Sequence, residues 1–209
     1  MSLFLFAVSM PTRNIKPTIV VEGPDGSGKT TLANTLCEYL GLEYKHLTYI
    51  EKPEDMYEQF REAEDLMFKG GILLDRYIMS NKVYAKATGD KEVYESNRFW
   101  YNMSVLIQSG RVYHITCLPA PKDFYISEFR RLCKERDELY TSETLMSKVY
   151  DIYLDMHDLL VQDSNGSRYC MTYNRNPQLQ WLYDHWPTDV AITEALVKKN
   201  SAPASETSE

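Results

Sequence analysis

The stretch KPTIVVEGPDGSGKTT, residues Lys16 to Thr31, decides the fold of this chain of 209 residues. It contains TIVVE, Thr18 to Glu22, a run rich in β-branched residues that is typical of a buried strand. After a glycine-rich turn the sequence continues as TTLANTLCEYL, in which leucines recur at helical spacing before Gly41. The stretch therefore predicts a strand, a tight turn and a helix.

The turn matches a phosphate-binding motif in full. Gly23, four further residues, Gly28, Lys29 and Thr30 follow the pattern G-x-x-x-x-G-K-[ST] between a predicted strand and a predicted helix. Glycines let such a loop wrap a polyphosphate with backbone N–H groups pointing inward, at the positive end of the helix. The lysine then reaches the β- and γ-phosphates, and the threonine hydroxyl ligates Mg²⁺. We therefore predict a site for ATP or GTP with Mg²⁺, made by Gly23, Asp25, Gly26, Ser27, Gly28, Lys29, Thr30 and Thr31.

The composition is that of a globular protein with one core, because 44% of the residues are apolar and 25% are charged. We expect a single domain over residues 16–197, an N-terminal extension over 1–15 and a flexible Ser/Ala/Glu-rich tail over 198–209. The opening MSLFLFAVSM is too short to span a bilayer, so no membrane segment is expected.

The charge and the cysteines narrow the function classes further. A net charge of −7 argues against a protein that binds nucleic acid by neutralising phosphates, since that requires clustered Lys and Arg. The four cysteines have no short paired spacing of the kind that zinc or redox motifs use, which indicates reduced thiols and a cytoplasmic protein.

Extended and helical segments alternate along the rest of the chain. Further strands are predicted around Lys45–Ile50, Gly71–Asp75, Arg111–Leu118 and Arg168–Asn174. Helices are predicted over Glu54–Lys69, Ser80–Thr88, Glu92–Ser109, around Glu128–Arg131, over Glu143–Val161, and in two closing segments, Pro177–Trp186 and Thr188–Lys199. Such alternation implies βαβ units, and hence a three-layer α/β/α fold with a five-stranded parallel sheet.

Asp75 and Arg76 stand at the tip of the predicted third strand, in LLDRYIMSNKVYA. Ligands collect beyond the carboxyl ends of parallel strands, so we expect this pair beside the glycine-rich loop. There the carboxylate can organise Mg²⁺ or a water, and the guanidinium can bind an acceptor phosphate through two parallel hydrogen bonds. The alternative is a salt pair at a strand end without a ligand.

EGPDGSGKTT, followed by DRY and then by Ser80 and Tyr84, resembles the thymidylate kinase family and its relatives among the nucleotide and deoxynucleoside kinases. The resemblance implies a P-loop kinase fold with a lid, and transfer of a phosphoryl group from ATP with Mg²⁺ to a small nucleotide. It also implies a homodimer, since thymidylate kinases are commonly dimeric.

Several site residues are assigned by this resemblance. Arg76 is expected to bind the phosphate of a deoxynucleoside monophosphate, and Asp75 to organise the metal ion together with Thr30. Asp25 is expected to contact the deoxyribose hydroxyl or to assist on the acceptor side, with Tyr84 nearby. The acceptor implied is dTMP or a related pyrimidine nucleotide, which includes nucleotides with a modified base.

EFRRLCKERDELY, Glu128 to Tyr140, occupies the place of the family's lid, about residues 128–142. One thymidylate kinase subtype has an arginine after the loop aspartate, where this chain has Gly26. The resemblance therefore implies that lid arginines supply the positive charge to the transferring group, with Arg131 and Arg136 ahead of Arg130. An exposed charged helix is the alternative interpretation.

Recognition of the base is expected in the helix before the third strand. By resemblance, Phe60 would stack on the base and Arg61 would contact a base carbonyl. Each could equally be an ordinary packing or surface residue, because this helix is shorter than in thymidylate kinases.

Two other functions stay open at the level of sequence. A deoxynucleoside kinase shares the fold and needs a carboxylate base for the sugar 5′-hydroxyl, and Glu51 lies where such a base could sit. A P-loop kinase or ATPase that acts on nucleic acid is the third candidate, and a basic channel leading to Lys29 would favour it.

Overall fold

Five parallel strands form the sheet of this protein, whose structure is a computed structural model that describes residues 18–48, 52–90, 96–136, 142–167 and 169–173. The strands lie in the order β2-β3-β1-β4-β5, and each neighbouring pair is parallel. Their bounds are Thr18–Glu22 (β1), Glu43–His46 (β2), Ile72–Asp75 (β3), Val112–Cys117 (β4) and Cys170–Tyr173 (β5).

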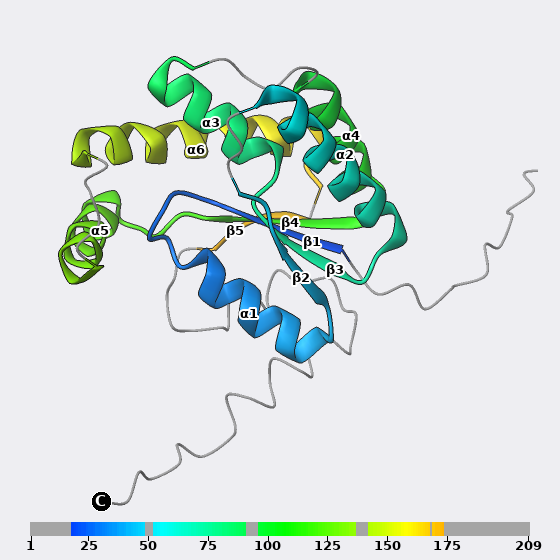
Figure 1. The fold of residues 1–209 in the computed structure, drawn as a ribbon, viewed down its shortest axis with the longest axis horizontal. Helices are drawn as coiled ribbons and strands as arrows, with labels where there is room; N and C mark the ends of the chain where they lie inside the picture. The colour runs from blue at the N-terminus through cyan, green and yellow to red at the C-terminus, as the bar shows by residue number, and fades with distance from the viewer. Residues whose placement is uncertain (1–17, 49–51, 91–95, 137–141, 168, 174–209) are drawn as a thin grey trace, which may run out of the picture.

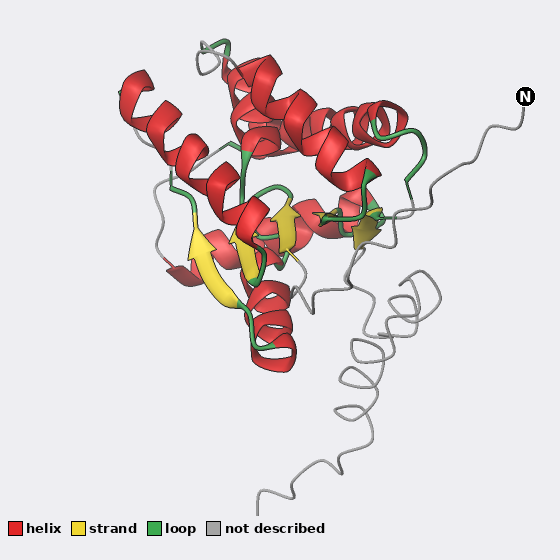
Figure 2. Ribbon diagram, turned by 90° about the vertical axis from the view of Figure 1, so that its right-hand side faces the viewer, coloured by secondary structure: helices red, strands yellow, loops and turns green. Residues whose placement is uncertain are grey.

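Helices cover both faces of the sheet, as Figures 1 and 2 show. One face carries α1, and the other carries α2, α3, α4 and α6, while α5 lies at the end of the sheet toward which β1 runs. The bounds are Lys29–Leu40 (α1), Pro53–Lys69 (α2), Ile78–Thr88 (α3), Ser96–Gln108 (α4), Lys122–Arg136 (α5) and Glu143–Asp163 (α6). The three-layer α/β/α prediction is therefore confirmed.

The central strands are buried on both faces, which explains their composition. All residues of β1, β3 and β4 are buried, and β1 lies between the other two. A strand that is covered on both faces has no solvent side, so it reads as a near-continuous apolar run rather than as an alternating one. Alternate residues of β1 accordingly pack into different cores: Ile19 and Val21 lie with the α1 side, and Val20 with the opposite side.

The carboxyl ends of β1 and β3 lie side by side and position the candidate site. Val21 is paired in register with Asp75, and the N–H of Arg76 donates to the Val21 carbonyl at 2.9 Å. The loop that follows β1 and the DR pair that follows β3 therefore meet at one edge of the sheet, as parallel pairing requires.

Two boundaries differ from the predictions. The second strand is Glu43–His46 rather than a run around Lys45–Ile50, because its register places Glu43 against Ile72 and His46 against Asp75, where β3 ends. The segment predicted as a helix around Glu128–Arg131 belongs to a longer helix, α5. The predicted extension 1–15, the tail 198–209 and the two closing helices lie outside the described residues.

None of the helices in the described ranges is long and apolar enough to cross a membrane.

Candidate active site

The glycines of the loop after β1 are required by its geometry. Gly23 has φ +143°, and a Cβ atom there would lie 2.5 Å from the carbonyl oxygen of Cys117. Gly28 caps α1 in the left-handed conformation with φ +91°. Both values are accessible to glycine and strained for other residues. The loop can thus turn tightly into a 12-residue helix whose first N–H groups face the site.

Lys29 is buried at the first position of α1. Its Nζ donates to the carbonyl oxygen of Pro24 at 2.7 Å, so the ammonium is held within the loop. Burial and, to a smaller extent, the nearby charge of Arg76 lower the pKa of Lys29 to about 8, against the opposing effect of Asp25. A polyphosphate in the loop would offer this ammonium a stronger, charged partner than the carbonyl does.

Asp75 is fully buried and has the features of a metal ligand. Its Oδ2 accepts hydrogen bonds from the hydroxyls of Thr30 (3.1 Å) and Tyr44 (2.9 Å), and the Nδ1 of His46 lies 3.3 Å away. Its Oδ1 has no hydrogen-bond partner among the described residues. A buried carboxylate oxygen without a partner, next to a P-loop hydroxyl, is the donor set that Mg²⁺ takes in such loops. Thr30 and Asp75 therefore fit the metal predicted from sequence.

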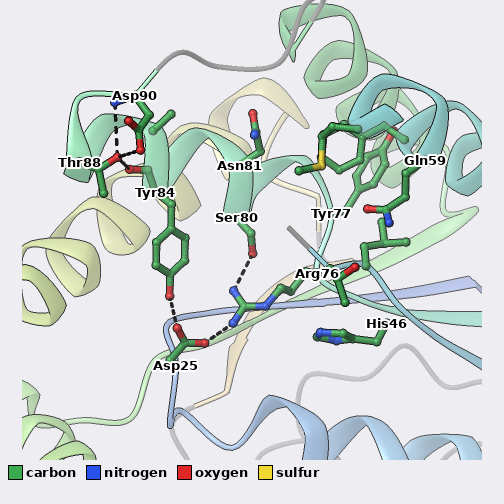
Figure 3. Close-up of a pocket in the computed structure, with 15 residues that line it drawn as sticks. Asp25, His46, Gln59, Arg76, Tyr77, Ser80, Asn81, Tyr84, Thr88 and Asp90 are labelled. Atoms are coloured by element: carbon green, nitrogen blue, oxygen red, sulfur yellow. Dashed lines mark hydrogen bonds and ion pairs between the residues drawn. The ribbon is translucent and has the colours of Figure 1, made fainter. Parts of the chain in front are cut away.

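Arg76 links the DR turn to the loop, as Figure 3 shows. Its guanidinium pairs with the carboxylate of Asp25, and the Tyr84 hydroxyl donates to the other oxygen of Asp25 at 2.8 Å. Burial alone would raise the pKa of Asp25, but the charges of Arg76 and Lys29 hold it below its ordinary value. Arg76 also has φ +77°, a strained conformation for a residue with a side chain. Asp25, Arg76 and Tyr84 thus form one charged cluster at the end of β3.

Glu22 lies beneath this cluster and is fully buried. Its carboxylate accepts the backbone N–H groups of Tyr77 (2.7 Å) and Ser80 (3.2 Å) and the hydroxyl of Ser80. The Ser80 hydroxyl in turn lies 2.7 Å from that of Tyr153. Burial raises the pKa of Glu22, and the hydrogen bonds from Ser80 oppose the rise. The N-cap residue of α3, Tyr77, makes no side-chain capping hydrogen bond. The Glu22 carboxylate, at the end of β1, accepts the N–H groups at the start of α3 in its place.

A cavity of about 460 Å³ opens beside Arg76. The lining residues are of three kinds: charged and hydroxyl-bearing side chains around Arg76, apolar and aromatic side chains in or next to β2, α2 and α3, and the side-chain amides of Gln59 and Asn81. They are Asp25, His46, Leu47, Thr48, Met56, Gln59, Phe60, Arg76, Tyr77, Ser80, Asn81, Tyr84, Ala85, Thr88 and Asp90. A concave, largely apolar site with a few convergent polar groups is typical of a small-molecule pocket.

Of the sequence-predicted site residues, Asp25, Phe60, Arg76 and Tyr84 line this cavity. Phe60 lines it, yet its ring also packs edge-on against Tyr77 and Phe99, so it is a core residue as well. Arg61 does not line the cavity: it lies exposed on α2 and pairs with Glu58 at 2.9 Å, because it faces away from the neighbouring Phe60. Arg61 is therefore not among the residues that the structure brings to the cavity. Glu51 lies outside the described residues.

The lid arginines stay predictions. Arg130 is bound to Glu143 at 2.5 and 2.6 Å, and Arg131 to Glu128 at 3.0 Å, all on the solvent-facing side of α5 and α6. Arg136 is the last residue of α5, and residues 137–141 of the proposed lid lie outside the described part. The part of α5 that lies next to the loop consists of Leu132 and Phe129. A Cβ atom added at Gly26 would lie 3.5 Å from each of these two side chains.

Sequence reasoning missed three residues that the structure places in or under the site: Glu22, Gln59 and Tyr44. Glu22 was assigned only to the strand, although a carboxylate inside an apolar run is itself a signal for a buried partner. Gln59 stands one position before Phe60, and its Oε1 is buried without a hydrogen-bond partner among the described residues. The contact of Tyr44 with Asp75 could not be predicted from local sequence, because it depends on the register of β2 against β3.

Comparison with known proteins supports the sequence resemblance. No protein-family model matches the chain. A curated probable thymidylate kinase of Methanococcus aeolicus is 27% identical over 71% of this chain and 83% of its own length. The YorR protein of Bacillus subtilis, solved in complex with phosphorylated GDP, has a TM-score of 0.57 at 19% identity and covers 87% of this chain and 95% of its own. The chain is similar in sequence to a thymidylate kinase and has the fold of a P-loop kinase.

A thymidylate kinase from Candida albicans also matches this kinase in structure, with a TM-score of 0.49 at 17% identity over 85% of this chain and 94% of its own. The match to YorR bears on the fold, and the phosphotransferase assignment rests on the sequence match together with the P-loop geometry. The candidate site thus consists of a phosphate loop, a buried Asp75 that could bind a metal ion, and a cavity that meets the loop at Asp25 and Arg76.

Proposed function

We propose that this kinase transfers the γ-phosphoryl group of ATP to a deoxynucleoside monophosphate, with dTMP or a related pyrimidine nucleotide as acceptor. The observation that carries the proposal is the position of Arg76. Its guanidinium lines the cavity and pairs with Asp25 of the phosphate loop, so it stands between the nucleotide loop and the acceptor cavity. A fixed, planar cation at this junction suits a phosphate that must meet the γ-phosphate of ATP.

In-line transfer needs little more from the protein than positioning and charge. The loop N–H groups and the Lys29 ammonium would hold the β- and γ-phosphates, and Thr30 and Asp75 would hold Mg²⁺. The metal, when bound, neutralises charge on the phosphates. A monophosphate acceptor is already anionic at neutral pH, so Arg76 has to orient it and no strong base is required.

Arg76 must exchange its partner for this role. In the structure its charge is offset by Asp25, which a second hydrogen bond from Tyr84 holds in place. An acceptor phosphate carries more negative charge than the Asp25 carboxylate and can accept both guanidinium hydrogen bonds. Once the phosphate has replaced Asp25 at Arg76, the Asp25 carboxylate could accept a hydrogen bond from a sugar hydroxyl. We therefore place the deoxyribose of the acceptor beside the loop.

The far end of the cavity supports a planar base. Phe60 and Tyr77 give it aromatic walls, and the buried Oε1 of Gln59 has no hydrogen-bond donor in the part of the chain that the structure describes. A pyrimidine ring offers N–H donors at its edge, and the Gln59 amide can donate and accept in one plane. We therefore assign to Gln59 the polar contact that sequence analysis gave to Arg61.

A nucleoside acceptor is the second candidate, and one observation bears on it. A nucleoside kinase needs a free carboxylate near the 5′-hydroxyl. The described carboxylates of the cavity are Asp25, which pairs with Arg76, and Asp90, which accepts the Thr88 hydroxyl at 2.6 Å. These two described carboxylates suit a monophosphate acceptor, while Glu51, the base predicted for a nucleoside kinase, lies outside the described residues. A nucleic-acid substrate is less favoured, since Arg76 and His46 are the basic groups among the described lining residues.

The test is a two-panel assay. The full chain is incubated with ATP and Mg²⁺ and with each deoxynucleoside or each deoxynucleoside monophosphate in turn, including monophosphates with modified pyrimidines, and ADP release is followed. We expect turnover with pyrimidine monophosphates, and a diphosphate as product by mass spectrometry. Turnover with nucleosides but not with their monophosphates would replace the proposal by the nucleoside kinase.

A further inference from the structure

A second group of metal-ligating side chains lies away from the nucleotide site. His114 of β4, His157 of α6 and Cys170 of β5 place their ligand atoms within 4.8 Å of one another. All three are buried, with exposed fractions of 0%, 7% and 9%. They lie on the face of the sheet that α6 covers, opposite α1, because Val112, two residues before His114, packs into the core on that side.

The backbone brings these groups together by register. His114 and Cys170 are cross-strand partners in the parallel pairing of β4 with β5, and His157 of α6 lies against both strands, 4.0 Å from the Cys170 Sγ. Thr116, two residues after His114, points to the same face. Its hydroxyl lies 2.9 Å from Nδ1 of His157 and 3.5 Å from Nδ1 of His114. Two imidazoles, a thiol and a hydroxyl thus converge from three elements on one point.

The cluster is poorly satisfied by hydrogen bonds alone. The Cys170 Sγ lies 4.0 Å from Nδ1 of each histidine, and the His114–Thr116 contact of 3.5 Å is at the limit of a hydrogen bond. Each histidine faces the centre of the cluster with its Nδ1 atom, and neither of these atoms has a short contact with the thiol. Buried polar groups normally find partners, since leaving them unpaired costs free energy. A ligand at the centre would give the Cys170 Sγ and the two Nδ1 atoms a common partner.

The dimensions and donor types favour one class of ligand. Metal–nitrogen and metal–sulfur bonds of about 2.0 and 2.3 Å in a tetrahedral zinc site separate the N and S atoms by roughly 3.5 Å. Closing the two observed S–N distances of 4.0 Å requires a shift of about 0.5 Å, and the histidine nitrogens, which lie within 4.8 Å of each other, would also move together. Imidazole and thiolate ligands select Zn²⁺ and similar borderline metals, whereas Mg²⁺ takes oxygen ligands. This set is therefore chemically distinct from Asp75 and Thr30.

We propose that His114, His157 and Cys170 form a structural zinc site, with the Thr116 hydroxyl or a water as fourth ligand, which joins β4, β5 and α6. Binding forms a zinc–sulfur bond to Cys170 and breaks its S–H bond, and the proton passes to solvent. The site would stabilise the β5 edge of the sheet. It would also stabilise the central turns of α6, where Tyr153 reaches the Ser80 hydroxyl one helical turn before His157.

The experiment is Co²⁺ and Zn²⁺ binding by the full chain, stripped of metal with a chelator. We expect one equivalent of Co²⁺ to give a thiolate-to-cobalt charge-transfer band, which Zn²⁺ abolishes and excess Mg²⁺ does not. Cys170→Ser should lose the band, and His157→Ala should lose stoichiometric binding. Cys37→Ser is the matched control, because Cys37 is partly exposed on α1, and it should keep the band.

A second measurement does not depend on variants that fold poorly. One equivalent of Zn²⁺ should raise the thermal midpoint of the wild-type protein by several degrees, and by much less in folded Cys170→Ser. No band and no shift at one equivalent would overturn the proposal, and so would a band that persists in Cys170→Ser. Neither result depends on kinase activity, so both are independent of the proposed function.

Discussion

The guanidinium of Arg76 and the carboxylate of Asp25 form an ion pair that ties the carboxyl end of β3 to the phosphate loop. The pair is partly shielded from solvent, since the Arg76 side chain is 19% exposed. Its charges are therefore screened less than those of surface pairs. The pair keeps a cation in the cavity, and in the proposed function an acceptor phosphate replaces Asp25 as the partner of that cation.

Arg76→Ala should separate acceptor binding from ATP binding. We expect kcat/KM for the acceptor to fall by about 100-fold or more, since losing a shielded, charged hydrogen-bond donor costs about 2–5 kcal/mol. The dissociation constant of a non-hydrolysable ATP analogue, measured by calorimetry, should change by no more than a few fold. Arg61→Ala is the matched control, because Arg61 lies exposed on α2 with Glu58 and should leave both values unchanged. An unchanged acceptor profile in Arg76→Ala would remove this residue from the site.

Lys29 should make ATP affinity depend on pH in the alkaline range. Its pKa is lowered to about 8 by burial, so the free kinase loses this ammonium as the pH rises through about 8. Phosphate binding requires the charged form, so the dissociation constant of the ATP analogue should rise above that pH, approaching tenfold per pH unit. Lys29→Met should bind weakly with a flat profile over the same range.

Proton uptake gives a second readout of the same residue. Bound phosphates raise the pKa of Lys29 again, so nucleotide binding near pH 8.5 should take up protons, seen as a dependence of the binding enthalpy on the buffer. Affinity that stays constant from pH 7 to about 9.5, with no proton uptake, would contradict the lowered pKa.

Asp75→Asn should raise the requirement for Mg²⁺. The substitution removes the charge but keeps the acceptor that Thr30 and Tyr44 use, so the local fold is retained. We expect the Mg²⁺ concentration for half-maximal activity to rise by about tenfold or more, because Mg²⁺ depends on carboxylate charge. Tyr44→Phe is the control, since it removes a hydrogen bond to Asp75 and leaves the carboxylate. A lower kcat with an unchanged Mg²⁺ requirement would assign Asp75 to positioning alone.

The phosphate loop of this site could be predicted almost completely from the sequence. Gly23, Gly28 and Lys29 are contiguous in a strand–turn–helix context, and the backbone conformation that such a motif requires is what the structure has. Asp75 and Arg76 were predictable for the same reason: they directly follow a short apolar strand, and parallel strands end at one edge.

The acceptor side depends on contacts that no local pattern encodes. Phe60 and Arg61 are neighbours in sequence, but α2 turns one into the core and the other to solvent, and the helix alone does not say which face the cavity uses. Gln59 becomes visible only as a buried amide without a partner. Likewise, the register of β4 with β5 brings together His114 and Cys170, which are 56 residues apart in sequence.

Glu22 should act as a positioning residue for Arg76. Two substitutions separate its role as a hydrogen-bond acceptor from the effect of its negative charge. Glu22→Ala removes the acceptor of the Tyr77 and Ser80 N–H groups. Each buried group left unpaired costs about 1–3 kcal/mol, so we expect a lower free energy of unfolding and a higher acceptor KM. Glu22→Gln keeps an acceptor for both N–H groups and should retain the wild-type KM.

The charge of Glu22 should appear in the pH dependence of stability. Burial raises its pKa above the ordinary 4.5, so the protonated form is the one that the fold favours. Its contribution to stability is fully present below about pH 4.5 and is lost as the pH rises through the raised value. The free energy of unfolding of Glu22→Gln, relative to wild type, should therefore increase from about pH 4.5 upward and then level off. Urea unfolding at several pH values measures this difference, with the exposed Glu62→Gln as control. A difference that stays flat would mean that Glu22 keeps an ordinary pKa and that its charge is compensated by Arg76.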